Sequence, residues 1–123
     1  MSHTNYRYFA LGRHAMQVAL QLAGVSPGDA VMLPGFICRD LISSIVTLGA
    51  RPSFYDVDRN LDPLTLDRTV RPRVIIAVNY FGFPQKLEPF ERFRADTGAV
   101  IIEDNAHGFL SRDLDGRELG QRT

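Results

Sequence analysis

The sequence predicts a three-layer α/β/α domain built around a mainly parallel sheet. Helical patterns and short apolar, strand-like runs alternate along the chain, and several of them end on glycine or proline. This alternation is typical of a parallel sheet covered by helices on both faces. The chain has 123 residues, 45% of them hydrophobic, which is enough apolar material for the core of one domain.

The first helix is expected from Gly12 to Ala23, where apolar residues recur at helical spacing and Gly24 can close the last turn. A turn follows from Ser26 to Asp29, because proline and glycine occupy positions there that suit one. Ala30 to Leu33 is then a short buried strand, which the Pro34-Gly35 pair terminates.

The second helix is expected from Arg39 to Leu48, with one apolar face, and Gly49 ends it. Pro52 to Asp58 follows as the second strand. Leu64 to Val70 is predicted to form a short helix, because Asp62-Pro63 is a favourable helix start.

The third strand is expected from Val74 to Val78, and a further helix from Leu87 to Thr97, which Gly98 closes. The fourth strand begins at Val100 and runs into polar residues. Near the end of the chain, Asp115-Gly116 stands between two short segments, which is typical of a two-residue β-hairpin turn.

Composition and charge exclude several functional classes. The formal net charge is zero and there is no basic block, so the electrostatic footprint of a nucleic-acid-binding protein is absent. Met1 to Arg7 lacks the apolar core of a secretion signal, and no apolar run approaches the roughly 20 residues that a membrane span needs. We therefore expect a cytoplasmic protein with no membrane partner. The single cysteine, Cys38, excludes an intrachain disulfide.

The stretch from Val100 to His107 carries the strongest functional pattern, because a β-branched apolar run leads directly into two carboxylates, an amide and an imidazole. Ligands collect outside the carboxyl ends of parallel strands, so this polar strand end is expected to face one. Side chains alternate along a strand, and Glu103 and Asp104 should therefore point in opposite directions. Asp104 can either bind a protonated ring nitrogen or accept a hydrogen bond within a turn.

His107 can donate a hydrogen bond to a ligand or act as a general acid, or it can lie in a polar loop without a ligand. No second histidine or cysteine stands at metal-ligand spacing from it, so no metal site is expected. Gly12 and Arg13 open the first helix, where free N–H groups and the helix dipole favour a phosphate, although every helix has such a start.

Two other pairs of residues follow predicted strands. Asn79 and Tyr80 end the third strand and should lie beside the end of the fourth if the two strands are neighbours; Asn79 can instead cap the following turn. Phe36 and Cys38 follow the first strand and can lie over a flat ring. We expect, however, that Phe36 is part of the core and that Cys38 is a small buried residue.

Several motifs, taken in order, resemble the amino-terminal part of the DegT/StrS-type sugar aminotransferases, which are pyridoxal-phosphate (PLP) enzymes with the aspartate-aminotransferase fold. The matching stretches are Leu11 to Ala15, Pro27 to Asp29, Leu48 to Pro52, Tyr55 to Asp58, Val78 to Pro84, Ile102 to His107 and Asp115 to Gly120. The resemblance covers nearly the whole chain from about Leu11 onward. It implies that residues 1–123 are an incomplete large domain of PLP fold type I, with no second domain.

The resemblance also implies a role for individual residues. Asp104 would bind the pyridine nitrogen of PLP and keep it protonated, which makes the ring an electron sink. His107 would hydrogen-bond the ring hydroxyl, and Gly12 and Arg13 would offer backbone N–H groups to the phosphate. Cys38 lies near the position where the family places an aromatic residue that stacks on the ring.

A PLP aminotransferase also needs a lysine that holds the cofactor as a Schiff base and moves the proton. The only lysine, Lys86, stands at the start of a surface helix and does not match the family lysine, so the chain contains no catalytic residue. The resemblance therefore implies a fragment that is inactive alone. The intact enzyme would be a homodimer that transfers an amino group from a donor such as glutamate to a keto-sugar nucleotide.

Two other functional classes were weighed against this one. A non-catalytic α/β module that binds a nucleotide or a protein partner remains the alternative, because the lysine is missing. A dinucleotide-binding oxidoreductase is disfavoured, because the first strand is not followed by the Gly-x-Gly-x-x-Gly turn that would bind a pyrophosphate.

Overall fold

The computed structural model describes residues 6–123; the expectation that the chain has no secretion signal falls mostly on residues 1–5, which lie outside the described part. Residues 6–123 form a four-stranded sheet in which every pairing of neighbouring strands is parallel. The strands are β1 (Ala30–Pro34), β2 (Arg51–Tyr55), β3 (Val74–Val78) and β4 (Val100–Asp104), in the order β2-β1-β3-β4. The predicted α/β fold is confirmed.

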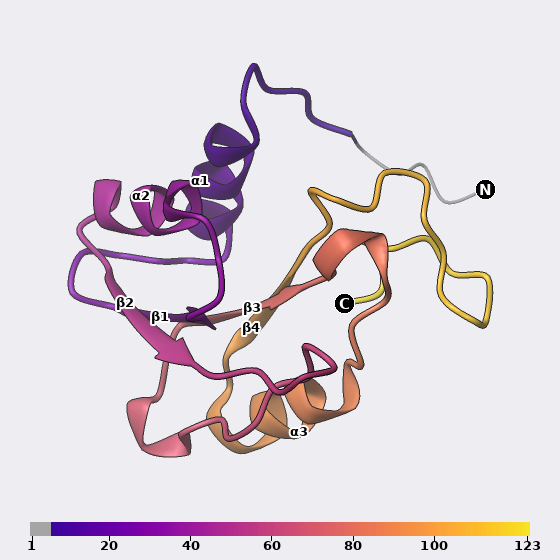
Figure 1. The fold of residues 1–123 in the computed structure, drawn as a ribbon. Helices are drawn as coiled ribbons and strands as arrows, with labels where there is room; N and C mark the ends of the chain where they lie inside the picture. The colour runs from indigo at the N-terminus through magenta and orange to yellow at the C-terminus, as the bar shows by residue number, and fades with distance from the viewer. Residues whose placement is uncertain (1–5) are drawn as a thin grey trace.

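Helices cover both faces of the sheet, which gives the predicted three layers (Figure 1). α1 (Gly12–Leu22) and α2 (Arg39–Thr47) pack together on one face, and α3 (Glu88–Thr97) lies on the other. α3 begins with a proline in its first turn and ends at Gly98, whose φ of 77° is the left-handed conformation expected of a closing glycine. Each helix ends within one residue of its predicted position.

The core consists of two apolar clusters, one on each face of the sheet. The cluster under α1 and α2 includes Leu20, Ile45 and Ile76, and the cluster under α3 includes Phe90 and Phe93; all five side chains are fully buried. Burying each such side chain contributes roughly 1.5–3 kcal/mol. β3 lies in the centre of the sheet and is buried along its whole length, which explains its uninterrupted apolar sequence.

The predicted helix from Leu64 to Val70 is wrong in its first half. Only Arg68–Val70 is helical, as a single 3-10 turn capped by the Asp67 side chain. The residues before it are extended, because Val57 forms a bridge with Pro63 and the Leu64 N–H donates to the Asp56 carbonyl. The same pairing explains why β2 ends at Tyr55, whereas the sequence predicted a strand that continues to Asp58.

The predicted hairpin turn at Asp115-Gly116 is present, but its loop is one residue longer than expected. The Asp113 N–H donates to the Arg117 carbonyl, so residues 114–116 form the loop, with Gly116 at a φ of 79°. A glycine in the left-handed conformation is typical of this longer loop. The arms are joined by an isolated bridge between Arg112 and Glu118. Within residues 6–123, none of the helices has the length and apolar character that a bilayer crossing requires.

Candidate functional site

The carboxyl ends of β3 and β4 lie side by side. Val78 pairs with Asp104 in the parallel register, and the Asn79 N–H donates to the Asp104 carbonyl at 2.9 Å, which extends the pairing by one residue. Ile102 packs against the core under α1 and α2, so alternation places Asp104 on that face and Glu103 on the face of α3. Asn79 and Tyr80 therefore follow β3 beside the end of β4, as predicted.

Two cavities meet at Asp104. The first has a volume of about 360 Å³ and lies between the segments that follow β1, β3 and β4; its walls include Cys38, Asp104 and His107. The second has a volume of about 450 Å³ and lies between α1 and β4; its walls include Gly12, Arg13, Cys38 and Asp104. The structure thus brings together every residue for which the sequence predicted a cofactor role.

Asp104 is half-buried and forms part of the turn that follows β4. Its Oδ1 accepts a hydrogen bond from the Ala106 N–H at 3.0 Å, so the carboxylate has the turn role that is the alternative to ligand binding. The same side chain lines both cavities, and the turn role therefore does not remove it from the site.

His107 is exposed and fixed against the loop that follows β3. Its Nδ1 accepts a hydrogen bond from the Phe81 N–H at 3.3 Å, and the two rings stack with centroids 5.9 Å apart. This contact assigns the proton of the neutral imidazole to Nε2, which is then the donor available to a ligand. Phe81 has a φ of 55°, a left-handed conformation that is uncommon for an aromatic residue.

Glycines let the loops after β3 and β4 approach each other closely. A Cβ added to Gly82 would lie 3.1 Å from the His107 carbonyl oxygen and 3.4 Å from the Gly108 Cα. The φ of Gly82 is also positive, at 82°. The position of His107 in the cavity therefore depends on the absence of a side chain at residue 82.

The expectation that Phe36 is in the core and Cys38 buried is wrong, because the segment after β1 runs along the open edge of the sheet. Phe36 is 59% exposed and Cys38 is exposed; both line the first cavity. Phe36 stacks on Tyr80 with centroids 5.6 Å apart, and the Tyr80 hydroxyl donates to the Phe36 carbonyl at 2.7 Å. One wall of the cavity is therefore aromatic.

The first turn of α1 has no side-chain cap, since the preceding residue is the apolar Leu11. The N–H groups of a first turn have no partner within the helix, so those of Gly12 and Arg13 can serve a ligand. The Arg13 guanidinium lies 3.7 Å from Asp40 in an exposed pair. The Arg13 carbonyl accepts a hydrogen bond from the buried Ser44 hydroxyl at 2.9 Å, which fixes this turn against α2.

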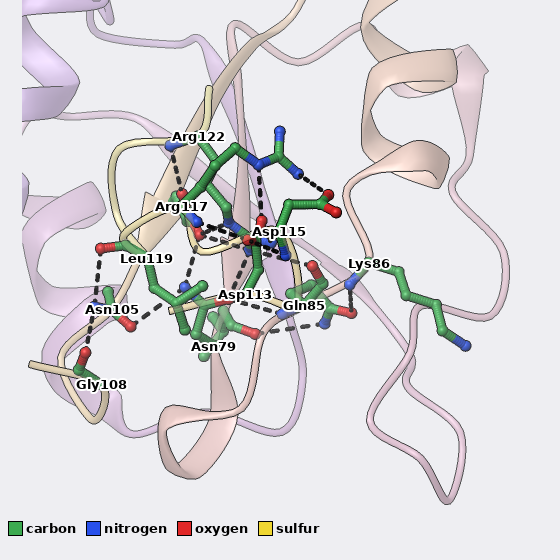
Figure 2. Close-up of polar contacts among 12 residues, drawn as sticks. Asn79, Gln85, Lys86, Asn105, Gly108, Asp113, Asp115, Arg117, Leu119 and Arg122 are labelled. Atoms are coloured by element: carbon green, nitrogen blue, oxygen red, sulfur yellow. Dashed lines mark hydrogen bonds and ion pairs between the residues drawn. The ribbon is translucent and has the colours of Figure 1, made fainter. Parts of the chain in front are cut away.

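Glu103 belongs to a buried polar cluster with Asn79 and Arg122, on the other side of β4 from Asp104. Figure 2 shows Asn79 and Arg122 within this network of polar contacts. The Glu103 carboxylate lies 2.6 Å from the Arg122 guanidinium, and these side chains are only 1% and 4% exposed. Burial by itself would raise the pKa of Glu103, but hydrogen bonds from Asn79 and Arg122 outweigh it and hold the pKa below its usual value. The sequence did not reveal Arg122; the one available indication was that a buried Glu103 would need a cation.

Lys86 lies away from the cavities. Its Nζ forms an ion pair with Asp62 at 2.8 Å, and its side chain is 72% exposed. In Figure 2 it points away from the polar cluster. Among the residues that the structure describes, no group of three or more histidine, cysteine or acidic side chains could hold a metal ion.

Comparison with known proteins relates this geometry to a family. The model of the DegT/DnrJ/EryC1/StrS aminotransferase family matches residues 9–123. The chain is 35% identical over 115 residues to 3-amino-5-hydroxybenzoate synthase of Amycolatopsis mediterranei, and this match covers 89% of this chain and 29% of that protein. It is 34% identical over 105 residues to UDP-2-acetamido-2-deoxy-3-oxo-D-glucuronate aminotransferase of Pseudomonas aeruginosa, covering 81% of this chain and 29% of that protein.

Solved structures agree with this relationship. The aminotransferase TlmJ of Streptoalloteichus hindustanus superposes with a TM-score of 0.75 at 29% identity, over 89% of this chain and 31% of that one. The chain therefore spans about three-tenths of the length of its relatives. These matches also confirm the prediction of PLP fold type I. The chain belongs to the DegT/DnrJ/EryC1/StrS aminotransferase family.

Proposed function

We propose that this chain supplies the part of a PLP-dependent sugar aminotransferase that holds the pyridine ring of the cofactor. The observation that carries the proposal is the position of Asp104, a half-buried carboxylate on the wall of a cavity at the carboxyl ends of parallel strands. The cavity volume of about 360 Å³ falls within the range that small-molecule sites occupy.

The residues around the cavities fit such a cofactor. Asp104 would hold a protonated ring nitrogen by a charge-assisted hydrogen bond, and the His107 Nε2–H would serve an oxygen on the ring. Gly12 and Arg13 would offer their N–H groups to the phosphate, and Cys38 would lie against the face of the ring. When bound, PLP supplies an electron sink for charge that develops on the substrate carbon.

The chain's own side chains prepare the site for this chemistry. A carboxylate opposite the ring nitrogen favours the protonated form of that nitrogen, which is the task we assign to Asp104. The Tyr80 hydroxyl donates to the Phe36 carbonyl at 2.7 Å, and its pKa, raised to about 12, keeps it a donor well above neutral pH. The stacked pair of Phe36 and Tyr80 gives one wall an apolar surface.

The proton-transferring amine is the part of the site that we do not assign to this chain. Lys86 is engaged with Asp62 outside both cavities, so we propose that the chain alone is inactive in transamination. One relative is named for its action on a UDP-linked keto sugar, and we propose the same substrate class here, with an amino acid such as glutamate as donor. We also propose that residues 1–123 form part of one cofactor-binding domain and that the working form is a homodimer.

The test is the affinity of the chain for PLP, measured by equilibrium dialysis with absorption detection. Asp104→Asn should weaken binding by roughly 10-fold or more, because a charge-assisted hydrogen bond is lost. Asp115→Asn is the matched control, since Asp115 lies on the hairpin and its side chain is 80% exposed. Equal affinity of Asp104→Asn and the unaltered chain would contradict the proposal and favour a non-catalytic binding module. Turnover of a keto-sugar nucleotide by the chain alone would contradict its inactivity.

A further inference from the structure

We propose that the buried pair of Glu103 and Arg122, joined by Asn79, is a positioning device that sets the location of the Asp104 carboxylate. Glu103 and Asp104 are adjacent on β4 but point to opposite faces, so the pair acts on the site from behind. The role of Asp104 toward PLP rests on the proposed function, whereas the geometric coupling stands on contacts within the chain.

Two kinds of contact hold the end of β4 within residues 6–123. The first is the parallel pairing with β3, which runs up to Asp104. Arg122 approaches Glu103 from the carboxyl-terminal segment. Its Nε donates to Glu103 Oε1 at 2.7 Å, and its backbone N–H donates to Glu103 Oε2 at 3.1 Å. Both carboxylate oxygens are therefore held.

Asn79 transmits this anchoring to the backbone of Asp104. Its Nδ2 donates to Glu103 at 2.9 Å and to Asn105 at 3.3 Å. Its Oδ1 accepts from the Gln85 N–H at 2.8 Å and from Arg122 at 3.2 Å. These contacts use every hydrogen-bonding position of the amide, so the side chain has one orientation. The N–H of the same residue donates to the Asp104 carbonyl at 2.9 Å.

The turn after Asp104 is fixed by the neighbouring amide. The Asn105 Nδ2 donates to the Gly108 carbonyl at 2.8 Å and to the Leu119 carbonyl at 3.1 Å (Figure 2). This turn carries the Ala106 N–H, which donates to Asp104 Oδ1 at 3.0 Å. The direction of the Asp104 carboxylate consequently depends in part on Glu103, Asn105 and Arg122, which do not line the first cavity.

Variants that remove the charges of Glu103 and Arg122 singly or together can distinguish a positioning role from a contribution to stability alone. Removing Glu103 leaves the buried Arg122 with only the more distant Asp113, at 3.7 Å, and removing Arg122 takes the close cation from Glu103. Either change destabilises the fold, whereas replacing both partners by residues without charge is often neutral, and Asp113 keeps its ion pair with Arg117 at 2.8 Å. Glu103→Gln combined with Arg122→Met should therefore regain much of the stability that either single change costs. It removes the guanidinium contacts to Asn79 and Gln85, and so should not regain the position of Asp104.

The experiment measures amide hydrogen exchange of Asn79 and Ala106 by NMR, together with PLP affinity. Arg122→Lys keeps the charge but loses the planar set of donors. Both amides should then exchange about 10-fold faster, and PLP should bind roughly 10-fold more weakly. These effects are comparable with the loss of outer-shell partners at ligand sites, which is roughly 10-fold or more. The double variant should show the same changes with a restored unfolding midpoint. Phe93→Leu, a core change under α3, should lower the midpoint without selective exchange at Asn79 and Ala106.

Unaltered exchange of both amides in folded Arg122→Lys would overturn the proposal, as would exchange and affinity that recover with stability in the double variant. If Arg122→Lys does not fold, the double variant decides by the same measurements. If the exchange effects appear but Asp104→Asn binds PLP as tightly as the unaltered chain, the positioning device stands and the proposed function fails.

Discussion

Tyr80 and Asp104 share the wall of the first cavity, and they are coupled electrostatically: burial, followed by the negative charge of Asp104, raises the pKa of the Tyr80 phenol to about 12. The ordinary pKa of the phenol is 10.0, so ionising it costs more free energy in the folded chain than in the unfolded chain. The hydroxyl is a hydrogen-bond donor in the structure, to the Phe36 carbonyl at 2.7 Å, which only the protonated form can be.

This coupling predicts an alkaline loss of stability that depends on Tyr80. A group whose folded pKa is raised contributes fully below its unfolded pKa, and the contribution is lost as the pH rises from about 10 to about 12. Tyr80→Phe should cost about 1 kcal/mol near neutral pH, because a hydrogen bond is removed, and should lose less stability between about pH 8 and about pH 11 than the unaltered chain. Urea unfolding at both pH values measures this.

Tyr8→Phe is the control for the alkaline experiment, because Tyr8 is 90% exposed. It should behave like the unaltered chain at both pH values. Tyr55 is present in all three proteins, and burial, the larger cause of its raised pKa, is common to them; only the smaller contribution from the Tyr80 charge is lost in Tyr80→Phe. An alkaline loss in Tyr80→Phe as large as that of the unaltered chain would show that the phenol of Tyr80 is not responsible.

The lowered pKa of Glu103 predicts the opposite dependence at acid pH. Stability from this group is present above its unfolded pKa, near 4.5, and is lost as the pH falls through the lower folded value. Glu103→Gln should be less stable than the unaltered chain at about pH 7, by about 3 kcal/mol, because the buried charge of Arg122 keeps only the more distant Asp113, at 3.7 Å, as a partner. The difference should shrink at about pH 3, below the unfolded pKa of Glu103, because the unfolded chain then binds a proton that the folded chain binds only at lower pH. Unfolding midpoints at the two pH values test this. A difference that is the same at both would contradict the assignment.

The sheet could be predicted from the sequence because its strands are buried on both faces. β3 lies between two other strands and under helices on both sides, so its residues are all apolar, and its predicted bounds, Val74 to Val78, agree with the structure. The segment from Leu64 onward could not be predicted in the same way. Its conformation is decided by its pairing with Asp56 and Val57, and the sequence of the segment itself does not show which residues it will pair with.

The candidate site likewise has one part that the sequence could predict and another part that it could not. Strand alternation alone predicted that Asp104 and Glu103 point in opposite directions, because this follows from the geometry of any strand. Their partners depend on tertiary contacts. Arg122 contacts Glu103, which lies 19 positions earlier in the sequence. Phe36 lies outside the core and stacks on Tyr80, 44 positions later. Neither contact corresponds to a local sequence pattern from which it could be predicted.

The buried hydroxyl of Ser44 predicts a link between α2 and the first turn of α1. It donates to the Arg13 carbonyl at 2.9 Å, while the adjacent Ser43 is exposed. Ser44→Ala should lower the free energy of unfolding by about 1 kcal/mol and speed hydrogen exchange of the first-turn amides of α1. Ser43→Ala, measured by the same urea titration and NMR exchange, should do neither. Equal losses in the two variants would contradict a specific role of the Arg13 contact, because alanine has the higher helix propensity and the exchange by itself should not destabilise α2.

Gly82 and Gly116 allow backbone strain to be separated from close packing at the site. Both have a φ near 80°, so alanine at either position should cost about 1 kcal/mol for the left-handed conformation. Space is open around Gly116, whereas a Cβ at residue 82 would press on the His107 carbonyl at 3.1 Å. Gly82→Ala should therefore cost more than Gly116→Ala in urea unfolding, and it alone should weaken PLP binding, because the loop that carries His107 must shift. If the two variants lost equal stability and bound PLP equally, the close approach of the loops after β3 and β4 would have no role in placing His107.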